Sequence, residues 1–379
     1  MRSVTYAHSV RRSLRIAAVF ISWFLFLSTL VCSAQDPCLT LRVPVWTNNQ
    51  IQLTFLGEYN RNYVVESSDD FQNWLPIATN SDFCVTRVIL VGTLKKANFY
   101  RAGLTAHTHT LAGLVVKEGV SFKGNNINID AYDSADTAHF PNGLWNSTNA
   151  FAGCNVTTAE GLLDVGNAAI HGRLLLAPGA NYALGVHGLV GDIPTNWPAQ
   201  TGVQAADWVC SNYYFDLPDV FAPYTSGLAP NLGTGTNSYV LGSGSYYVNG
   251  NFLVNQNLQV NGVATLYVTG NFTAGSLTIS PGATLRLYLG QSIGSSSATF
   301  GHIDNWGNAF NLQFFGLPTC TSITLAGENG YLGTIYAPEA TLTVNVANNL
   351  PFNYQGACVA NSAVVNGDFN YHFDHNLSR

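Results

Sequence analysis

The sequence predicts an all-β protein in which a small β-sandwich precedes a single-stranded parallel β-solenoid, or β-helix. Three observations support this prediction. Short apolar segments alternate with Asn, Thr, Ser and Gly, one such segment returns after 20 residues, and charged residues make up only 9% of a chain with 36 glycines. Alternating apolar and polar residues are typical of strands. A fixed period near 20 residues is typical of stacked coils rather than of a closed globule.

The repeat lies between Tyr246 and Gly290. The segment Tyr247-Val248-Asn249-Gly250-Asn251-Phe252 returns 20 residues later as Tyr267-Val268-Thr269-Gly270-Asn271-Phe272, and a looser copy follows at Leu287-Tyr288-Leu289-Gly290. Each copy alternates as a strand with one buried face does. We expect the asparagines to form turns and stacked amide ladders, which are structural roles.

A second recurrent motif marks corners between strands. Ala177-Pro178-Gly179-Ala180 and Ser280-Pro281-Gly282-Ala283 place Pro and Gly at the central positions of a turn. Proline presets φ at the first position and glycine supplies positive φ at the second, so both copies predict type II turns. Ala337-Pro338-Glu339-Ala340 has Glu in place of Gly and therefore predicts another geometry. These copies extend the predicted solenoid domain over residues 111–379.

The N-terminus predicts export. Arg11, Arg12 and Arg15 precede an uncharged run from Ile16 to Val31, and Cys32-Ser33-Ala34 supplies small residues before a cleavage point. This order is typical of a secretory signal peptide, here residues 1–34. An uncleaved anchor is the alternative, although the run is shorter than the ~20 residues of a spanning helix. We therefore expect a secreted, extracellular or cell-surface protein with no membrane span in its mature chain.

The balance of charge argues against a nucleic-acid partner. The formal net charge is −6, and the four arginines of the predicted signal peptide are among the few basic residues. Nucleic-acid binding depends on a basic surface. The expected partners are polysaccharides or other surface proteins.

Residues 36–104 alternate over six short runs separated by turn residues, which predicts the small sandwich. Within it, Tyr63 to Trp74 reads as a strand, a turn and a buried Trp, and Phe99-Tyr100-Arg101 closes the segment. This part resembles a small fibronectin-III-like module of secreted bacterial proteins. The resemblance implies a non-catalytic domain with Trp74 in its core; a sugar platform at Trp74 is the alternative. His107 and His109 in the following junction fit solvated histidines, with a metal site as the alternative.

An irregular excursion at about residues 197–237 interrupts the predicted solenoid. It is rich in aromatic, Pro and Gly residues and has Asp216-Leu217-Pro218-Asp219 near its centre. A long segment without periodicity is typical of a functional loop or of a cover folded over the coils. The candidate ligand-binding residues here are Trp197, Trp208, Tyr213, Tyr214, Asp216 and Asp219.

The region after Leu111 carries a set of motifs that belong together. They are Ile129-Asp130-Ala131-Tyr132-Asp133-Ser134, Asp164-Val165-Gly166-Asn167-Ala168, Leu332-Gly333-Thr334-Ile335-Tyr336-Ala337-Pro338, Gln355-Gly356-Ala357-Cys358 and the ending Gly367 to Asp374. As a set they resemble a family of uncharacterised secreted bacterial β-solenoid proteins. The resemblance implies surface or extracellular placement and brings no activity with it.

Three groups of reactive side chains remain. Asp130, Asp133 and Asp136 recur every third residue, a spacing that suits either a Ca²⁺ site, the one cofactor considered, or three turn caps. The densest ionisable cluster lies near the C-terminus. A metal site that includes His375 would require the strand to end at Asp374. A terminal, solvated strand is the alternative. The cluster consists of Asp368, His372, Asp374 and His375. Six cysteines follow Cys32, and the one pairing we consider is Cys38 with Cys84, against buried free thiols.

The residues from Val240 to Asn345 include one Arg, one His, no Lys and three acidic residues. Glycoside hydrolysis needs two carboxylates about 5 to 10 Å apart, and the sequence shows no such pair in this part. No catalytic residue is assigned. The leading hypothesis is a non-catalytic structural or adhesive surface protein. The alternatives are an extracellular carbohydrate-binding or carbohydrate-degrading protein and a pilus or envelope assembly component.

Overall fold

The computed structural model describes two compact units, residues 1–109 and 110–379. The described residues of the first unit are its strands and the short segment 72–74. Those of the second unit are 113–124, 126–193, 201–211, 213, 215–233, 238–290, 295–325, 330–346 and 351–378. The protein is all-β, with a few short 3₁₀ helices. Among the described residues, no helix has the length and apolar character needed to cross a membrane.

The first unit contains two small antiparallel sheets. In one, β3 pairs with β1, β2 and β6, and in the other, β4 lies between β5 and β7. Val65 is buried and Trp74 is half-buried. The strands are β1 (Thr40–Leu41), β2 (Val45–Thr47), β3 (Gln50–Leu56), β4 (Arg61–Ser68), β5 (Leu75–Asn80), β6 (Arg87–Val91) and β7 (Phe99–His107).

The second unit is one large, mostly parallel sheet of 23 strands. Its first half comprises β8 (Leu114–Phe122), β9 (Asn128–Tyr132), β10 (Val156–Thr158), β11 (Leu162–Asp164), β12 (Ala169–His171), β13 (Leu174–Leu176), β14 (Asn181–Ala183), β15 (Leu189–Gly191), β16 (Gly202–Val203), β17 (Val209–Cys210) and β18 (Asn231–Leu232). Its second half comprises β19 (Tyr239–Leu241), β20 (Gly244–Val248), β21 (Phe252–Val260), β22 (Val263–Val268), β23 (Phe272–Ile279), β24 (Thr284–Leu289), β25 (Ser296–Asn305), β26 (Leu312–Gly316), β27 (Cys320–Leu325), β28 (Tyr331–Asn345), β29 (Phe352–Asn366) and β30 (Phe369–Asp374).

The 20-residue repeat corresponds to one step of parallel pairing. Tyr247 pairs with Tyr267 between β20 and β22, and Phe252 pairs with Phe272 between β21 and β23. Equivalent residues therefore lie side by side in neighbouring strands, about 4.8 Å apart. Strands in this part pair with the second strand along the chain, not with the next one.

The pairings form three parallel ladders, named here by their strands. Ladder A runs β17, β13, β10, β8, β29, β28, β26, β24, β22, β20. Ladder B runs β14, β11, β8, β29, β28, β27, β25, β23, β21. Ladder C includes β15, β12, β9, β30 and β29. The long strands β8, β28 and β29 contribute to more than one ladder, with register shifts between the parts.

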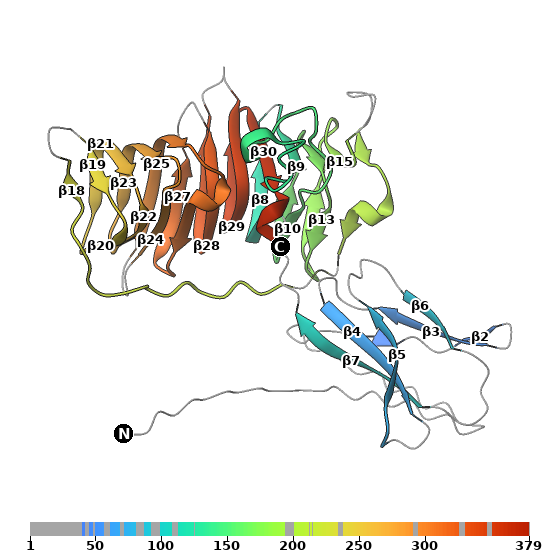
Figure 1. The fold of residues 1–379 in the computed structure, drawn as a ribbon. Coiled ribbons are helices and arrows are strands. Elements are labelled where there is room, and N and C mark those ends of the chain that lie inside the picture. Colours follow the sequence, from blue (N-terminus) through green and yellow to red (C-terminus); the bar gives the residue numbers. More distant parts are fainter. Residues whose placement is uncertain are drawn as a thin grey trace, which may run out of the picture. The chain divides into compact units, whose positions relative to one another are not determined.

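The order of strands in space differs from their order in the chain. Strand β8, the first of the unit, lies between β29 near the C-terminus and β10 and β11. The chain thus builds one end of the stack first, crosses to the other end, and returns strand by strand to β8. Residues 215–230 belong to this crossing and run along the stack toward β18 in Figure 1. We call these residues the strap.

The core consists of the apolar side chains that alternate along the ladders. Aromatic rings follow one another from strand to strand: Tyr331 and Tyr354 stack at 5.0 Å, and Tyr354 and Tyr371 at 4.7 Å. Parallel register places like residues next to each other, and offset stacking of such rings adds to the burial of their surface.

The corner motifs follow their sequence. Gly179 and Gly282 have positive φ angles of 94° and 77°. The amides of Ala180 and Ala283 donate to the carbonyls of Ala177 and Ser280 at 3.0 and 2.9 Å. These are the features of the predicted type II turns. Pro338-Glu339, without the glycine, instead lies inside the long strand β28, at the register shift between Ala337 and Thr341.

Candidate functional site

An aromatic column lies along ladder A. Tyr247, Tyr267, Tyr288, Phe315 and Tyr336 are consecutive register partners on five neighbouring strands. Tyr288 and Phe315 are stacked, with ring centroids 4.8 Å apart. Tyr247, Tyr288, Phe315 and Tyr336 are half-buried on the outward side of the sheet, whereas Tyr267 is buried at 6% exposure.

The strap packs along this column. Leu217 is buried against Val115 of β8 and Val359 of β29. One residue further, the hydroxyl of Tyr336 donates to the Pro218 carbonyl at 2.8 Å. Tyr224 contacts the ring of Tyr267 edge-on. The strap therefore contacts ladder A at β8, β29, β28 and β22.

The far part of the strap uses backbone groups as well. The Tyr224 hydroxyl lies 2.8 Å from both the Tyr246 and the Thr265 carbonyl oxygens. The amide of Leu228 donates to Ser245 at 2.9 Å, and the amide of Tyr247 donates to Leu228 at 2.8 Å. Burial raises the pKa of Tyr224 to about 12, so its phenol keeps its proton at physiological pH.

The predicted ligand residues of the excursion divide between the wall and the solvent. Tyr213 is buried and Trp208 packs against the core, so neither ring is a free sugar platform. Asp216 and Asp219 are exposed on the strap. They lie near enough to Tyr336 that, after burial itself, their negative charge helps to raise the pKa of Tyr336 to about 12. Trp197 and Tyr214 lie outside the described residues.

The outer side of ladder B carries two columns of small uncharged side chains. Two residues apart on a strand, side chains point to the same side of a sheet. The first column is Asn271, which directly precedes β23 and accepts from Ser297, followed by Ser297, Ser322, Thr341 and Ser362. The second column is Thr273, Thr299, Thr324, Thr343 and Val364. Each of these ten side chains is half-buried, as expected for the outer side of a sheet.

Contacts along the first column hold it in a fixed arrangement. The Ser297 hydroxyl donates to Asn271 Oδ1 at 3.2 Å, and the Ser297 amide donates to the same oxygen at 3.0 Å. The hydroxyls of Thr341 and Ser362 lie 3.0 Å apart. The branched side chain of threonine has restricted χ1, which keeps the second column regular.

A buried polar group joins two parts of the sequence that are far apart. Strand β30 pairs with β9, so His372 lies beside Asp130, and His372 Nδ1 is 2.6 Å from Asp130 Oδ1. Asn128 Nδ2 donates to the other oxygen of Asp130 at 3.0 Å. Trp145 stacks on the His372 ring with centroids 3.7 Å apart. Asp130 and His372 are 3% and 0% exposed, so this pair is closed to solvent and joins the C-terminal strand to β9.

Asp374 is a second buried carboxyl on the same strand. Its Oδ1 accepts hydrogen bonds from the amides of Ser134 and Asn376 at 3.0 and 3.1 Å, while its Oδ2 has no hydrogen-bond partner. Burial raises the pKa of Asp374. β30 ends at Asp374, but His375 turns to pack edge-on against Phe151. Asp368 precedes β30 and is half-buried.

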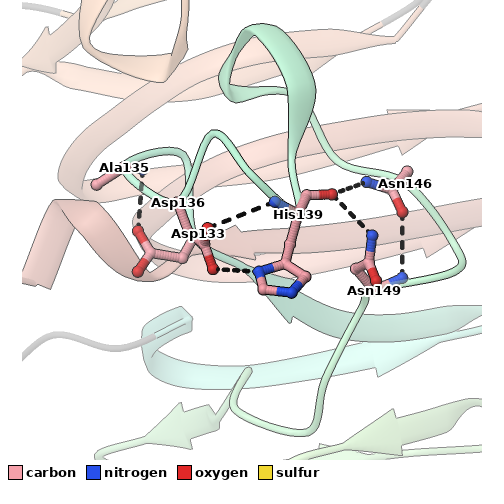
Figure 2. Close-up of polar contacts among 6 residues, drawn as sticks. All are labelled: Asp133, Ala135, Asp136, His139, Asn146 and Asn149. Atoms are coloured by element: carbon pink, nitrogen blue, oxygen red, sulfur yellow. Dashed lines mark hydrogen bonds and ion pairs between the residues drawn. The ribbon is translucent and has the colours of Figure 1, made fainter.

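The three aspartates considered for Ca²⁺ do not converge. Asp130 faces His372, whereas Asp133 and Asp136 lie in the following exposed loop (Figure 2). Asp133 accepts from the Ala135 amide at 3.0 Å, and Asp136 Oδ2 is 2.7 Å from His139 Nδ1. That hydrogen bond lowers the pKa of Asp136. Asn146 and Asn149 each donate to the His139 carbonyl at 2.8 Å, which completes a local turn network.

No three His, Cys, Asp or Glu side chains gather into a possible metal site within the part of the chain that the structure describes. Cys154, Cys320 and Cys358 are buried free thiols. Burial raises the pKa of Cys320 to about 12, which disfavours the thiolate form. Cys38 and Cys84 lie outside the described residues, as do His109 and the predicted signal peptide.

The sequence did not reveal two of these features. Asp130 and His372 are 242 residues apart, and only the pairing of β9 with β30 brings them together. The hydroxyl columns have a signal in the sequence, the recurrent Ser/Thr-x-Thr at 297–299, 322–324 and 341–343. Its spacing is irregular because the connecting loops differ in length, so a search for a fixed period passes over it.

Comparison with known proteins gives one family match. Residues 225–379 match a family described as Domain of unknown function (DUF7305). No curated protein and no solved structure matches the chain. The matching segment begins in the strap and includes β18 to β30, and it contains every residue of the aromatic column and of the hydroxyl columns.

Proposed function

We propose that the chain is a secreted or cell-surface, non-catalytic structural or adhesive protein built on a β-solenoid. In this proposal, ladders A, B and C are the three sides of the solenoid, and the first unit is a small sandwich that precedes it in the chain. Parallel pairing with the second strand along the chain, and the match of the 20-residue repeat to one pairing step, support the solenoid.

The observation that carries the proposal is the outer side of ladder B. Its two columns hold ten consecutive positions without a titratable group and without an aromatic ring. Such a surface has no acid, base or nucleophile of low pKa to offer a substrate. It does present many weak hydrogen-bonding groups in a fixed plane, which suits contact with an extended partner surface.

The ionisable groups elsewhere fit structural roles. The Asp130–His372 pair is buried, and Asp136 pairs with His139 inside its own turn. Lys117 of β8 forms an ion pair with Glu339 of β28, and this pair links the two strands. We infer that the protein binds rather than transforms its partner.

Two measurements test this proposal: where the protein is located, and whether the purified protein attaches to cells. Intact cells that secrete the protein are treated with a protease, and the purified mature chain is mixed with the same cells. The proposal expects loss of the protein on shaving and retention of the added protein on the cells. Fractionation with the inner envelope would favour the assembly component instead. A glycan-cleaving activity that disappears in Asp216→Asn or Asp219→Asn would overturn the non-catalytic role.

Carbohydrate binding is the second candidate, and the aromatic column favours it. The stacked, half-buried pair Tyr288 and Phe315 lies on ladder A between strands that the strap contacts at Pro218 and Tyr224. Rings in this arrangement can stack on the face of a sugar. The exposed carboxylate of Asp219 can accept hydrogen bonds from the sugar's hydroxyl groups. A pull-down on insoluble polysaccharides tests this: Tyr288→Ala should release the protein, whereas Leu253→Ala on ladder B should not. Equal retention of both variants would contradict it.

A further inference from the structure

We propose that the hydroxyl columns of ladder B bind the surface of ice. This inference rests on the proposed function, because it takes ladder B as the contact surface and names what that surface contacts. The ten positions described above match ice in their spacing, their chemistry and their rigidity.

The spacing is that of a two-dimensional lattice. Neighbouring strands lie about 4.8 Å apart, and residues two apart on one strand lie about 6.7 Å apart. Three consecutive strands carry a hydroxyl in both columns, at Ser297 and Thr299, Ser322 and Thr324, and Thr341 and Thr343. With the flanking strands β23 and β29, the array spans about 19 Å. Rows of oxygen atoms on exposed planes of ice repeat over distances of the same size.

The chemistry of the array matches water better than it matches other partners. A hydroxyl both donates and accepts hydrogen bonds, as does each water molecule of ice. A charged partner would find no opposite charge in the two columns, and a sugar chain would find no ring on which to stack. Each threonine adds a methyl group, which can occupy the gaps between ordered waters without competing for hydrogen bonds.

The array is rigid before it meets a partner. Its strands belong to the same apolar core, in which Ala298, Ile323 and Leu342 are buried directly between the outward residues. Contacts within the first column, such as that between Thr341 and Ser362, fix neighbouring hydroxyls relative to each other. A preformed surface loses little conformational entropy on binding, which weak individual contacts require.

Inhibition of ice recrystallisation by the full mature chain tests the inference. The wild-type protein should keep crystals small and should be enriched in a slowly grown ice phase. Thr324→Tyr places a large ring at the centre of the array and should raise the concentration needed for the same inhibition about tenfold. Thr324→Ser keeps the hydroxyl and should stay close to the wild type.

Thr278→Tyr is the matched control. Thr278 is also half-buried on an outward position, but it belongs to the other part of β23 and pairs with Gln259 and Asp304. This variant should retain the wild-type activity, and the circular dichroism spectra of all variants should show that they are folded. Absence of any ice effect in the wild type would overturn the inference, as would equal losses in Thr324→Tyr and Thr278→Tyr.

The same variants separate this inference from the proposed function. The wild type could have no effect on ice and yet attach to cells, with Thr324→Tyr losing that attachment. In that case the ice inference is wrong and the adhesive role stands. If neither ice nor cells retain the protein, both proposals are wrong.

Discussion

Replacement of Leu217 by alanine tests whether the strap holds the stack together. Leu217 is 7% exposed and packs on Val115 and Val359, at the place where β29 pairs with β8, the first strand of the second unit. The change removes three carbon groups at about 0.8 kcal/mol each, and a fully buried Leu→Ala change costs ~2–5 kcal/mol. The strap lies on the outside of the sheet and can relax, so we expect a loss of about 2 kcal/mol, the low end of that range.

Urea unfolding of the full mature chain, followed by circular dichroism, measures this loss. Leu228→Ala is the control, because Leu228 lies on the same strap with 58% exposure and attaches to ladder A through its backbone. It should lower the free energy of unfolding by about 0.5 kcal/mol or less. Limited proteolysis should show earlier cleavage of the strap in Leu217→Ala only. Equal midpoints and equal cleavage for both variants would refute the reasoning that the strap fastens β8 to β29.

Three further changes test the contacts around the strap and the C-terminal strand. Asp130→Asn weakens the buried hydrogen bond to His372 and should cost about 1–3 kcal/mol in urea unfolding, whereas Asp136→Asn, in an exposed pair, should leave the midpoint unchanged. Equal midpoints for the two would contradict a structural role of the buried pair. Tyr224→Phe removes the hydroxyl at the Tyr246 and Thr265 carbonyls and should cost about 0.5–1.5 kcal/mol by the same assay; no change would show that these contacts add nothing. The raised pKa of Asp374 means that the folded state binds the proton of this carboxyl more tightly than the unfolded state does. The protonated carboxyl therefore contributes stability below its ordinary pKa of about 3.9. This contribution is lost as the pH rises through the pKa of the folded state. Asp374→Asn should therefore be at least as stable as the wild type at neutral pH, and this advantage should shrink on acidification; a variant that is less stable at neutral pH than at acidic pH, relative to the wild type, would contradict the sign.

The class of fold could be predicted because its signals are local. Alternation, the return of Tyr247 to Phe252 at Tyr267 to Phe272, and the Pro-Gly corners each involve a few neighbouring residues, and the structure confirms an all-β protein with a large, mostly parallel sheet. The exception at Pro338-Glu339 also has a local cause. Without a glycine to take positive φ, the chain continues as strand β28 through a register shift.

The arrangement of the candidate site could not be predicted in the same way. That β29 returns to β8, and that β30 places His372 beside Asp130, depends on the long path of the strap. Nothing in the neighbourhood of Asp130 distinguishes a pairing partner for His372 from a Ca²⁺ ligand or a turn cap. Burial is equally hard to predict here: Tyr213 is buried, whereas Asp216, three residues later, is exposed.

We propose above that the outer side of ladder B is the contact surface of an extracellular, non-catalytic protein. Binding of the purified mature chain to the cells that secrete it, compared between Thr324→Tyr and Thr278→Tyr, tests this claim most directly. We expect Thr324→Tyr to lose binding and Thr278→Tyr to bind as the wild type does. Unchanged binding of Thr324→Tyr, in a variant shown to be folded, would contradict it.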